Sequence, residues 1–176
     1  MTKEMIEYSC FLYCPKCSAR ALRPGLPHGY HCDVCGFTFY LNVAAAVVAI
    51  IIDDKNRLLV ATRAKEPAKG TLDLPGGFAD PDETGEESVR REVREELNLE
   101  IVETNYLFSI PNEYPYGGVL YHTLDMVYRC KVKDYADMKA SDEIAALQWV
   151  GICELDPKKF GLKSIRGIIN RLIASA

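Results

Sequence analysis

The stretch that decides the fold is Gly76–Leu99, which reads GGFADPDETGEESVRREVREELNL. Within it, Thr84 is followed three residues later by Glu87. This spacing is typical of a capping box and predicts that a helix begins near Gly85. Residues four apart would place one apolar stripe on that helix, namely Val89, Val93 and Leu97. We therefore expect a glycine loop that leads into an amphipathic helix whose apolar stripe faces a core.

Three carboxylates crowd one arc of this helix beside the apolar stripe: Glu92, Glu95 and Glu96. Their charges repel one another unless a cation lies among them. Hard divalent ions such as Mg²⁺ prefer carboxylate oxygens and leave room for substrate phosphates. Arg91 lies four residues before Glu95 and can hold it, while Glu83 can reach back to Arg91 from the loop. The simpler interpretation is a solvated helix face with i,i+4 ion pairs.

The spacing of the whole stretch resembles the Nudix box, the signature of the Nudix hydrolases. The matching residues are Gly77, Glu83, Arg91, Glu92, Val93, Glu95, Glu96 and Leu99. One position departs from the pattern, because Asn98 stands where the family has glycine. A left-handed residue is wanted just after a helix end, and asparagine is the next best choice after glycine.

The resemblance implies an α/β fold, the Nudix α/β/α sandwich with helices on both faces of a mixed sheet. It also implies Mg²⁺- or Mn²⁺-dependent hydrolysis of the pyrophosphate bond in a nucleoside diphosphate linked to another group. By family analogy the metal ligands are Glu92, Glu96, Glu95 and the carbonyl of Gly76, with Glu83 and Arg91 as orienting partners in the catalytic set. The bound ions would neutralise the diphosphate and lower the pKa of a bound water.

The general base is left open between the box and a later loop. Glu92 is the alternative within the box. Glu143, in the segment SDEIAALQW, is a catalytic candidate on a later loop, and Glu113 is a third. For Glu143 the simpler interpretation is a surface residue that precedes a strand.

Two Cys-x-x-Cys pairs precede this domain, with fourteen residues between them: Cys14, Cys17, Cys32 and Cys35. This spacing predicts a structural zinc site with four thiolate ligands. A segment this short needs such a metal for stability, so we expect a small zinc ribbon over residues 1–40. Alternatives are buried free thiols, a redox pair, or ligation by Cys10, His28 or His31. The segment from Ala19 to His31 could form a short hairpin.

The remaining residues, 41–176, are assigned to the Nudix hydrolase domain. Period and composition predict strands at Ala44–Asp53, Arg57–Thr62, Glu100–Ile110, Tyr121–Val132 and Ala145–Val150. The first two should pair as a hairpin. Pro111–Gly118 is expected to be a loop. Apolar residues at helical spacing predict an amphipathic terminal helix: Ile165, Ile168, Ile169 and Leu172.

A zinc ribbon ahead of a Nudix domain resembles the NADH pyrophosphatase group. That group carries a Ser-Gln-Pro-Trp motif after the box, whereas Ser109–Gly118 reads SIPNEYPYGG here. The substrate is expected to be a small nucleotide, either ADP-ribose or an NADH-like dinucleotide, with Arg63, Tyr114 and Tyr116 as binding residues. Alternatives are a nucleoside triphosphate pyrophosphatase, or a non-catalytic regulator whose ribbon binds nucleic acid.

Composition limits the other classes of function. The net charge of -4 is mild and argues against a general nucleic-acid or membrane-surface binder. The longest apolar run, Val43 to Ile52, is too short to span a membrane. The start, MTKEMIEYSC, lacks the apolar region of a secretory signal. Seven cysteines fit poorly with a disulfide framework, so we expect a cytoplasmic protein. A homodimer is left open.

Overall fold

The computed structural model describes residues 11–26 and 29–175. They divide into two compact units. The first comprises the chain up to Val43 together with Pro115–Tyr121, and the second comprises Ala44–Tyr114 and the chain from His122 onward. Cys10, His28 and the N-terminal segment MTKEMIEYSC considered above lie outside the described residues.

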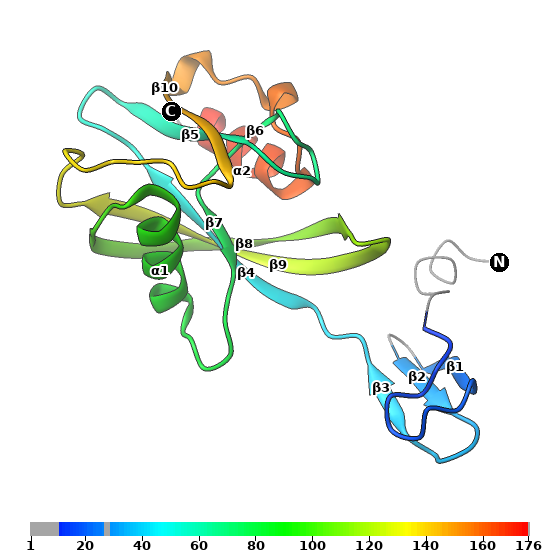
Figure 1. Ribbon diagram of the computed structural model, residues 1–176. Helices are drawn as coiled ribbons and strands as arrows, with labels where there is room; N and C mark the ends of the chain where they lie inside the picture. Colours follow the sequence, from blue (N-terminus) through cyan, green and yellow to red (C-terminus); the bar gives the residue numbers. More distant parts are fainter. Residues whose placement is uncertain (1–10, 27–28, 176) are drawn as a thin grey trace. The chain divides into compact units, whose positions relative to one another are not determined.

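The first unit contains a three-stranded antiparallel sheet (Figure 1). Strand β1 (Leu22–Leu26) pairs with β2 (Gly29–Cys32), and β2 pairs with β3 (Thr38–Tyr40). The short hairpin predicted before His31 is therefore confirmed. Its small core is made of Cys14, Leu22, Tyr30 and Cys32. Half of that core is cysteine, which fits a segment with too little apolar surface to fold on packing alone.

A four-stranded mixed sheet forms the centre of the second unit, in the order β7-β4-β9-β8. Its strands are β7 (Gly76–Phe78), β4 (Ala44–Ile51), β9 (Val119–Val132) and β8 (Ile101–Tyr116). Strand β4 is antiparallel to β7 and parallel to β9. The predicted mixed sheet is thus confirmed, and the glycine pair of the box lies on its edge strand β7.

A second sheet has the order β10-β5-β6 and is built from β10 (Ile144–Gly151), β5 (Arg57–Arg63) and β6 (Leu72–Asp73). The predicted hairpin between the strands at Ala44–Asp53 and Arg57–Thr62 is wrong. Beyond one isolated bridge, Ile52 to Leu58, the two strands enter different sheets. The reason is that both edges of β4 already pair with β7 and β9, and both edges of β5 with β10 and β6.

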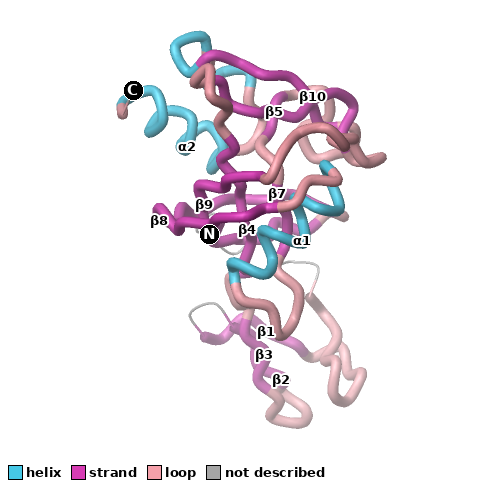
Figure 2. Tube along the Cα trace, turned by 90° about the vertical axis from the view of Figure 1, so that its left-hand side faces the viewer, coloured by secondary structure: helices cyan, strands magenta, loops and turns pink. Residues whose placement is uncertain are grey.

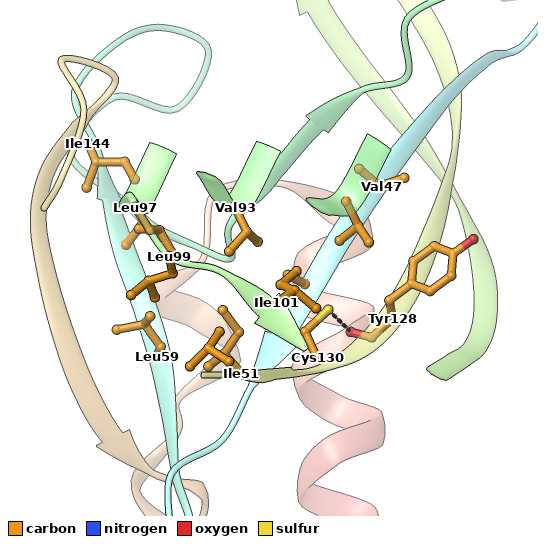
Figure 3. Packing of buried hydrophobic residues seen from close by; sticks show 14 residues of the cluster. Val47, Ile51, Leu59, Val93, Leu97, Leu99, Ile101, Tyr128, Cys130 and Ile144 are labelled. Atoms are coloured by element: carbon orange, nitrogen blue, oxygen red, sulfur yellow. Dashed lines mark hydrogen bonds between the residues drawn. The ribbon is translucent and has the colours of Figure 1, made fainter. Parts of the chain in front are cut away.

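Helix α1 (Gly85–Leu97) begins with the predicted capping box, in which Thr84 and Glu87 exchange hydrogen bonds. Its apolar stripe packs on one face of β4 and β9, and Figure 3 shows Val93 and Leu97 directed at this cluster. In the same view the thiol of Cys130 lies 3.8 Å from the carbonyl oxygen of Tyr128.

Helix α2 (Lys163–Ala174) follows two short 3-10 helices, η2 (Ile152–Glu154) and η3 (Pro157–Lys159). It packs the predicted terminal stripe against Val48 and Ile50 of β4, on the opposite face of the central sheet from α1. Figure 2 shows α1 and α2 along the chain trace. Alternate residues of β4 therefore serve two cores, which explains its continuous apolar sequence. Within the described residues, no helix combines the length and apolar character needed to cross a membrane.

The expected loop at Pro111–Gly118 is also wrong, because β8 continues to Tyr116 and turns only at the two glycines that follow. Proline lacks the N–H that a central strand needs, but β8 is the edge of its sheet and tolerates Pro111 there. The extension places Asn112 where its side-chain oxygen accepts the backbone N–H of Ser164 at 3.3 Å. This contact caps the start of α2 from a distant strand.

Asn98 occupies the left-handed position predicted for it, with a φ of 55°, and its side-chain N–H donates to the carbonyl of Asp137 at 3.0 Å. Asn98→Ala should lower the free energy of unfolding by about 1–2 kcal/mol, because alanine resists this conformation and loses the bond. Urea denaturation measures the change. Asn98→Gly is the matched control and should cost less. An alanine variant as stable as the wild type would contradict this account.

Candidate active site

The glycine pair brings the backbone of β7 into close contact with its neighbours. Gly76 has a φ of 145°, and a Cβ there would lie 2.1 Å from the carbonyl oxygen of Val47. A Cβ on Gly77 would lie 2.6 Å from Oε1 of Glu92. Glycine is therefore required at Gly76 by the backbone of β4, whereas a side chain at Gly77 would displace the carboxylate of Glu92.

One guanidinium gathers the acidic side chains, since Arg91 donates from Nε to Glu83 Oε1 at 2.7 Å and from Nη2 to Glu83 Oε2 at 2.9 Å. Its Nη1 donates to Glu92 Oε1 at 2.8 Å and to Glu95 Oε2 at 3.2 Å. The predicted contacts of Arg91 with Glu83 and with Glu95 are confirmed. These hydrogen bonds from Arg91, together with the N–H of Asp80, lower the pKa of Glu83 to about 2.

Glu96 lies apart from this guanidinium, against the glycine loop. Its Oε2 accepts the backbone N–H of Gly76 at 3.0 Å. Burial raises the pKa of Glu96 to about 8, and the charges of Glu92, Asp73 and Glu143 add to the effect. Burial also raises the pKa of Glu92, against the opposing influence of Arg91. Among the described residues, no cationic side chain forms an ion pair with Glu96, so a carboxylate is held here without a counter-charge.

The chemistry of this donor set fits a divalent cation. Arg91 gathers three carboxylates, those of Glu83, Glu92 and Glu95, and Gly76 of the glycine loop holds a fourth, that of Glu96. All are hard oxygen donors, the kind that Mg²⁺ and Mn²⁺ prefer. Within the part of the chain that the structure describes, these oxygens do not converge on one point as the cysteines do, because Arg91 and the N–H of Gly76 hold them.

The four cysteines of the first unit converge, with all their sulfur atoms within 4.8 Å of one another. Cys14 Sγ lies 3.7 Å from Cys35 Sγ, and Cys17 Sγ lies 3.7 Å from Cys32 Sγ. A tetrahedron of sulfurs around a central Zn²⁺, with zinc–sulfur bonds of about 2.3 Å, has edges of about 3.8 Å. Both sulfur–sulfur separations match this edge length, so the cluster fits a four-coordinate metal site.

Two of the three expected substrate-binding residues come together in the second unit. Arg63 forms an ion pair with Asp73, donates from Nε to the carbonyl of Pro67 at 2.7 Å, and donates from Nη2 to the hydroxyl of Tyr114 at 3.4 Å. The ring of Tyr114 meets that of Phe78 edge-on, with centroids 5.5 Å apart. The aromatic pair thus adjoins the glycine loop, since Phe78 directly follows Gly77.

Tyr116, the third expected residue, is 61% exposed and belongs to the other unit. The sequence interpretation missed Phe78 and Asp73. Phe78 carried one usable signal, because a large aromatic side chain immediately follows the glycine pair, and it remains 42% exposed. Asp73 carried none, because its role depends on Arg63 from the neighbouring strand β5.

The candidate bases lie in different surroundings. Oε1 of Glu143 lies 2.8 Å from Nζ of Lys65. The backbone N–H of Ser141, two residues before Glu143, donates to the carbonyl of Glu96 at 2.8 Å and brings this segment beside the acidic helix. The charge of Glu143 also adds to the rise in the pKa of Glu96. Glu113 instead pairs with Lys163 at the start of α2, 3.0 Å away. Of these two carboxylates, Glu143 is the one whose charge contributes to the raised pKa of Glu96.

Helices cover both faces of a mixed sheet, which defines an α/β fold. Carboxylates gathered at a glycine loop suit an enzyme that acts on phosphoanhydride substrates with divalent cations. The NUDIX domain model matches residues 42–172. The chain belongs to the Nudix family and is a hydrolase of pyrophosphate bonds.

Similar proteins include an ADP-ribose pyrophosphatase of Methanocaldococcus jannaschii, 32% identical over 135 residues that cover 76% of each chain. The NAD-capped RNA hydrolase NudC of Chromobacterium violaceum is 28% identical over 93% of this chain and 57% of its own length. The chain thus spans little more than half of the NudC relatives that it matches. A crystal structure of a NUDIX hydrolase from Nitrosomonas europaea matches with a TM-score of 0.70 and 25% identity, over 93% of this chain and 90% of that one.

Gly77→Ala tests the close approach of the loop to Glu92. The added methyl would displace the Glu92 carboxylate, which is 2.6 Å from the Cβ position, so hydrolysis should fall by at least about tenfold, as expected for a misplaced catalytic group. The melting temperature should change little, because the carboxylate can move. Steady-state rates and thermal denaturation measure both. Gly25→Ala is the control, since its Cβ would make only ordinary contacts; equal activity of both variants would contradict the role of the approach.

Proposed function

We propose that this chain hydrolyses the pyrophosphate bond of a nucleoside diphosphate linked to another group, with Mg²⁺ or Mn²⁺ as cofactor. Glu92, Glu95, Glu96 and the carbonyl of Gly76 would hold the cations. The observation that carries the proposal is the half-buried carboxylate of Glu96, which accepts the N–H of Gly76 and has no counter-charge among the described side chains. When bound, the cations would neutralise the diphosphate and acidify a water molecule.

The residues around the ligands would orient them. Arg91 holds Glu92 and Glu95 while its other edge binds Glu83 and the carbonyl of Phe78. Such fixed partners keep carboxylates in one geometry and reduce reorganisation during the reaction. Glu143 is our proposed general base, supported by its electrostatic influence on Glu96. Glu92 is the alternative within the box.

For the substrate we propose ADP-ribose or an NADH-like dinucleotide. The relatives named ADP-ribose pyrophosphatase and NAD-capped RNA hydrolase support this class. The structure supports it through Phe78 and Tyr114, whose rings lie beside the glycine loop and can pack on a base. Arg63 would act by fixing Tyr114 and not by binding phosphate, because it is committed to Asp73.

We propose that residues 1–40 form a zinc ribbon and residues 41–176 the catalytic domain. A closed four-thiolate site has no open coordination position, so the zinc would be structural. Thiolate ligation requires reduced cysteines, and the described cysteines are all free, which supports our proposal of a cytoplasmic protein. A purely regulatory, nucleic-acid-binding role is less favoured, since all the box glutamates are present.

A hydrolysis screen with Mg²⁺ and Mn²⁺ tests the proposed activity. The substrates are ADP-ribose, NADH, flavin dinucleotide, diadenosine polyphosphates and nucleoside triphosphates. Glu96→Gln should lower turnover of the preferred substrate by at least about 100-fold, because bound cations supply several kcal/mol of transition-state stabilisation. Glu103→Gln, on the exposed surface of β8, is the matched control. Full activity of Glu96→Gln would refute the metal role, and preference for triphosphates would favour the alternative substrate class.

Metal analysis tests the ribbon, since the purified protein should carry about one zinc per chain. Cys32→Ser removes a buried ligand and should release the zinc and unfold residues 11–43, as followed by proton NMR. Cys153→Ser changes an exposed thiol outside the ribbon and should retain the metal. Zinc-free protein with a folded ribbon would rule out the site.

A further inference from the structure

Asp125 is a buried carboxylate to which the hydrolysis described above assigns no part. It lies on β9, and only 4% of its surface is exposed. Oδ1 of Asp125 accepts the hydroxyl of Thr123 at 2.5 Å. Across the part of the chain that the structure describes, this is the one hydrogen bond to the carboxylate, and no cationic side chain pairs with it. A buried charged group normally has more partners than this, because its lost hydration must be replaced.

The sheet register places Asp125 beside the proposed substrate site. Ala46 of β4 is the direct neighbour of Phe78 on one side and of Asp125 on the other. Directly opposed residues of adjacent strands project from the same face. Two strand spacings separate the backbones of Phe78 and Asp125, or about 9.6 Å. Phe78, Ala46 and Asp125 therefore form a row across three neighbouring strands. In this row, only the methyl group of Ala46 stands between the aromatic ring and the carboxylate.

Tyr114 contacts the Phe78 end of this row. Strands β7 and β8 are the two outer strands of the sheet, with β4 and β9 between them. The rings of Phe78 and Tyr114 nevertheless meet, with centroids 5.5 Å apart, so the side chain of Tyr114 reaches from β8 to the end of the row that Phe78 occupies. The hydroxyl of Tyr114 is bonded to Arg63, a residue of the other sheet. Tyr114 thus links Phe78, at one end of the row, to Arg63 of the other sheet.

The surroundings select the kind of group that Asp125 can accept. Asp73 lies near enough for the charge of Asp125 to add to the effect of burial, which raises the pKa of Asp73. Arg63 is already paired with Asp73. Asp125, Asp73 and Arg63 thus supply two carboxylates and one guanidinium, and the guanidinium is paired with Asp73. The carboxylate of Asp125 therefore repels phosphate oxygens and attracts hydrogen-bond donors.

We propose that Asp125 is a specificity-determining residue that accepts a hydrogen bond from the sugar or base attached to the diphosphate. The donor is a ribose hydroxyl or an exocyclic amino group, placed over Ala46 beside Phe78. This inference rests on the proposed function, because it takes the diphosphate to lie on the acidic helix next to Gly77. A site built around a buried acceptor rejects ligands that lack the donor, since the acceptor is then left unpaired.

Asp125→Asn is the primary test, because it keeps the shape of the side chain and its contact with Thr123. For ADP-ribose, KM should rise about 10- to 100-fold, the loss expected for a hydrogen bond to a charged group. The value of kcat should stay within about threefold of the wild type, since the acidic helix is unchanged. Asp53→Asn is the matched control: Asp53 pairs with Arg57 in a turn, and its variant should leave both constants unchanged.

A second substrate identifies the donor. Inosine diphosphate ribose carries a carbonyl in place of the amino group of ADP-ribose. If the amino group is the donor, the wild type should prefer ADP-ribose by KM and Asp125→Asn should lose the preference. If a ribose hydroxyl is the donor, the wild type should treat both substrates alike and the variant should bind both more weakly. Either result supports the proposal.

Binding separates this proposal from the proposed activity. Calorimetry with ADP-ribose and Ca²⁺, which need not support turnover, should give a dissociation constant about 10- to 100-fold weaker for Asp125→Asn. If the wild type binds but does not hydrolyse, the proposed function fails while Asp125 is still tested. Thr123→Val removes the hydroxyl that holds the Asp125 carboxylate in its orientation. It serves if Asp125→Asn does not fold, and it should raise the dissociation constant severalfold because the acceptor is no longer positioned. Folded variants within twofold of the wild type in KM and in dissociation constant would overturn the proposal.

Discussion

The site depends on the contact between carboxylates of helix α1 and the two glycines of strand β7, Gly76 and Gly77, which have no side chain. Helix α1 can place Glu92 and Glu96 on β7 only because Gly77 has no Cβ and Gly76 offers its N–H. The apolar stripe of α1 is fully buried against β4 and β9, so the helix cannot rotate about its axis. Burial on one side of the helix therefore fixes the direction of the carboxylates on the other.

This arrangement places like charges together at an energetic cost. Arg91 offsets part of the repulsion, and the lowered pKa of Glu83 shows where its influence is strongest. Glu96 is beyond the hydrogen bonds of Arg91, and its raised pKa reflects burial beside other acids. A structure that kept Glu96 for stability alone would gain by replacing it with an apolar residue. Retaining an acid here is consistent with a cation-binding role.

The parts of the fold that sequence could predict are those set by neighbours in the chain. The capping box at Thr84, the stripe of α1 and the left-handed Asn98 follow from residues a few positions apart. The pairing of strands cannot be predicted in this way. From the sequence, β4 and β5 resemble a hairpin, but β7 and β9 occupy both edges of β4 in the structure. Pro111 suggested a loop because the sequence does not reveal that β8 is an edge strand.

The same division separates the chemistry of the site from its selectivity. Carboxylates for a diphosphate come from consecutive turns of one helix, so a short motif can specify them and relatives with different substrates can share it. The row from Phe78 through Ala46 to Asp125 draws on three strands that are distant in sequence and adjacent only through register. No local pattern marks such a row, and each of its residues can change without disturbing the helix. Substrate preference can therefore diverge within this family while the box remains intact, and strand register is where its determinants should be sought.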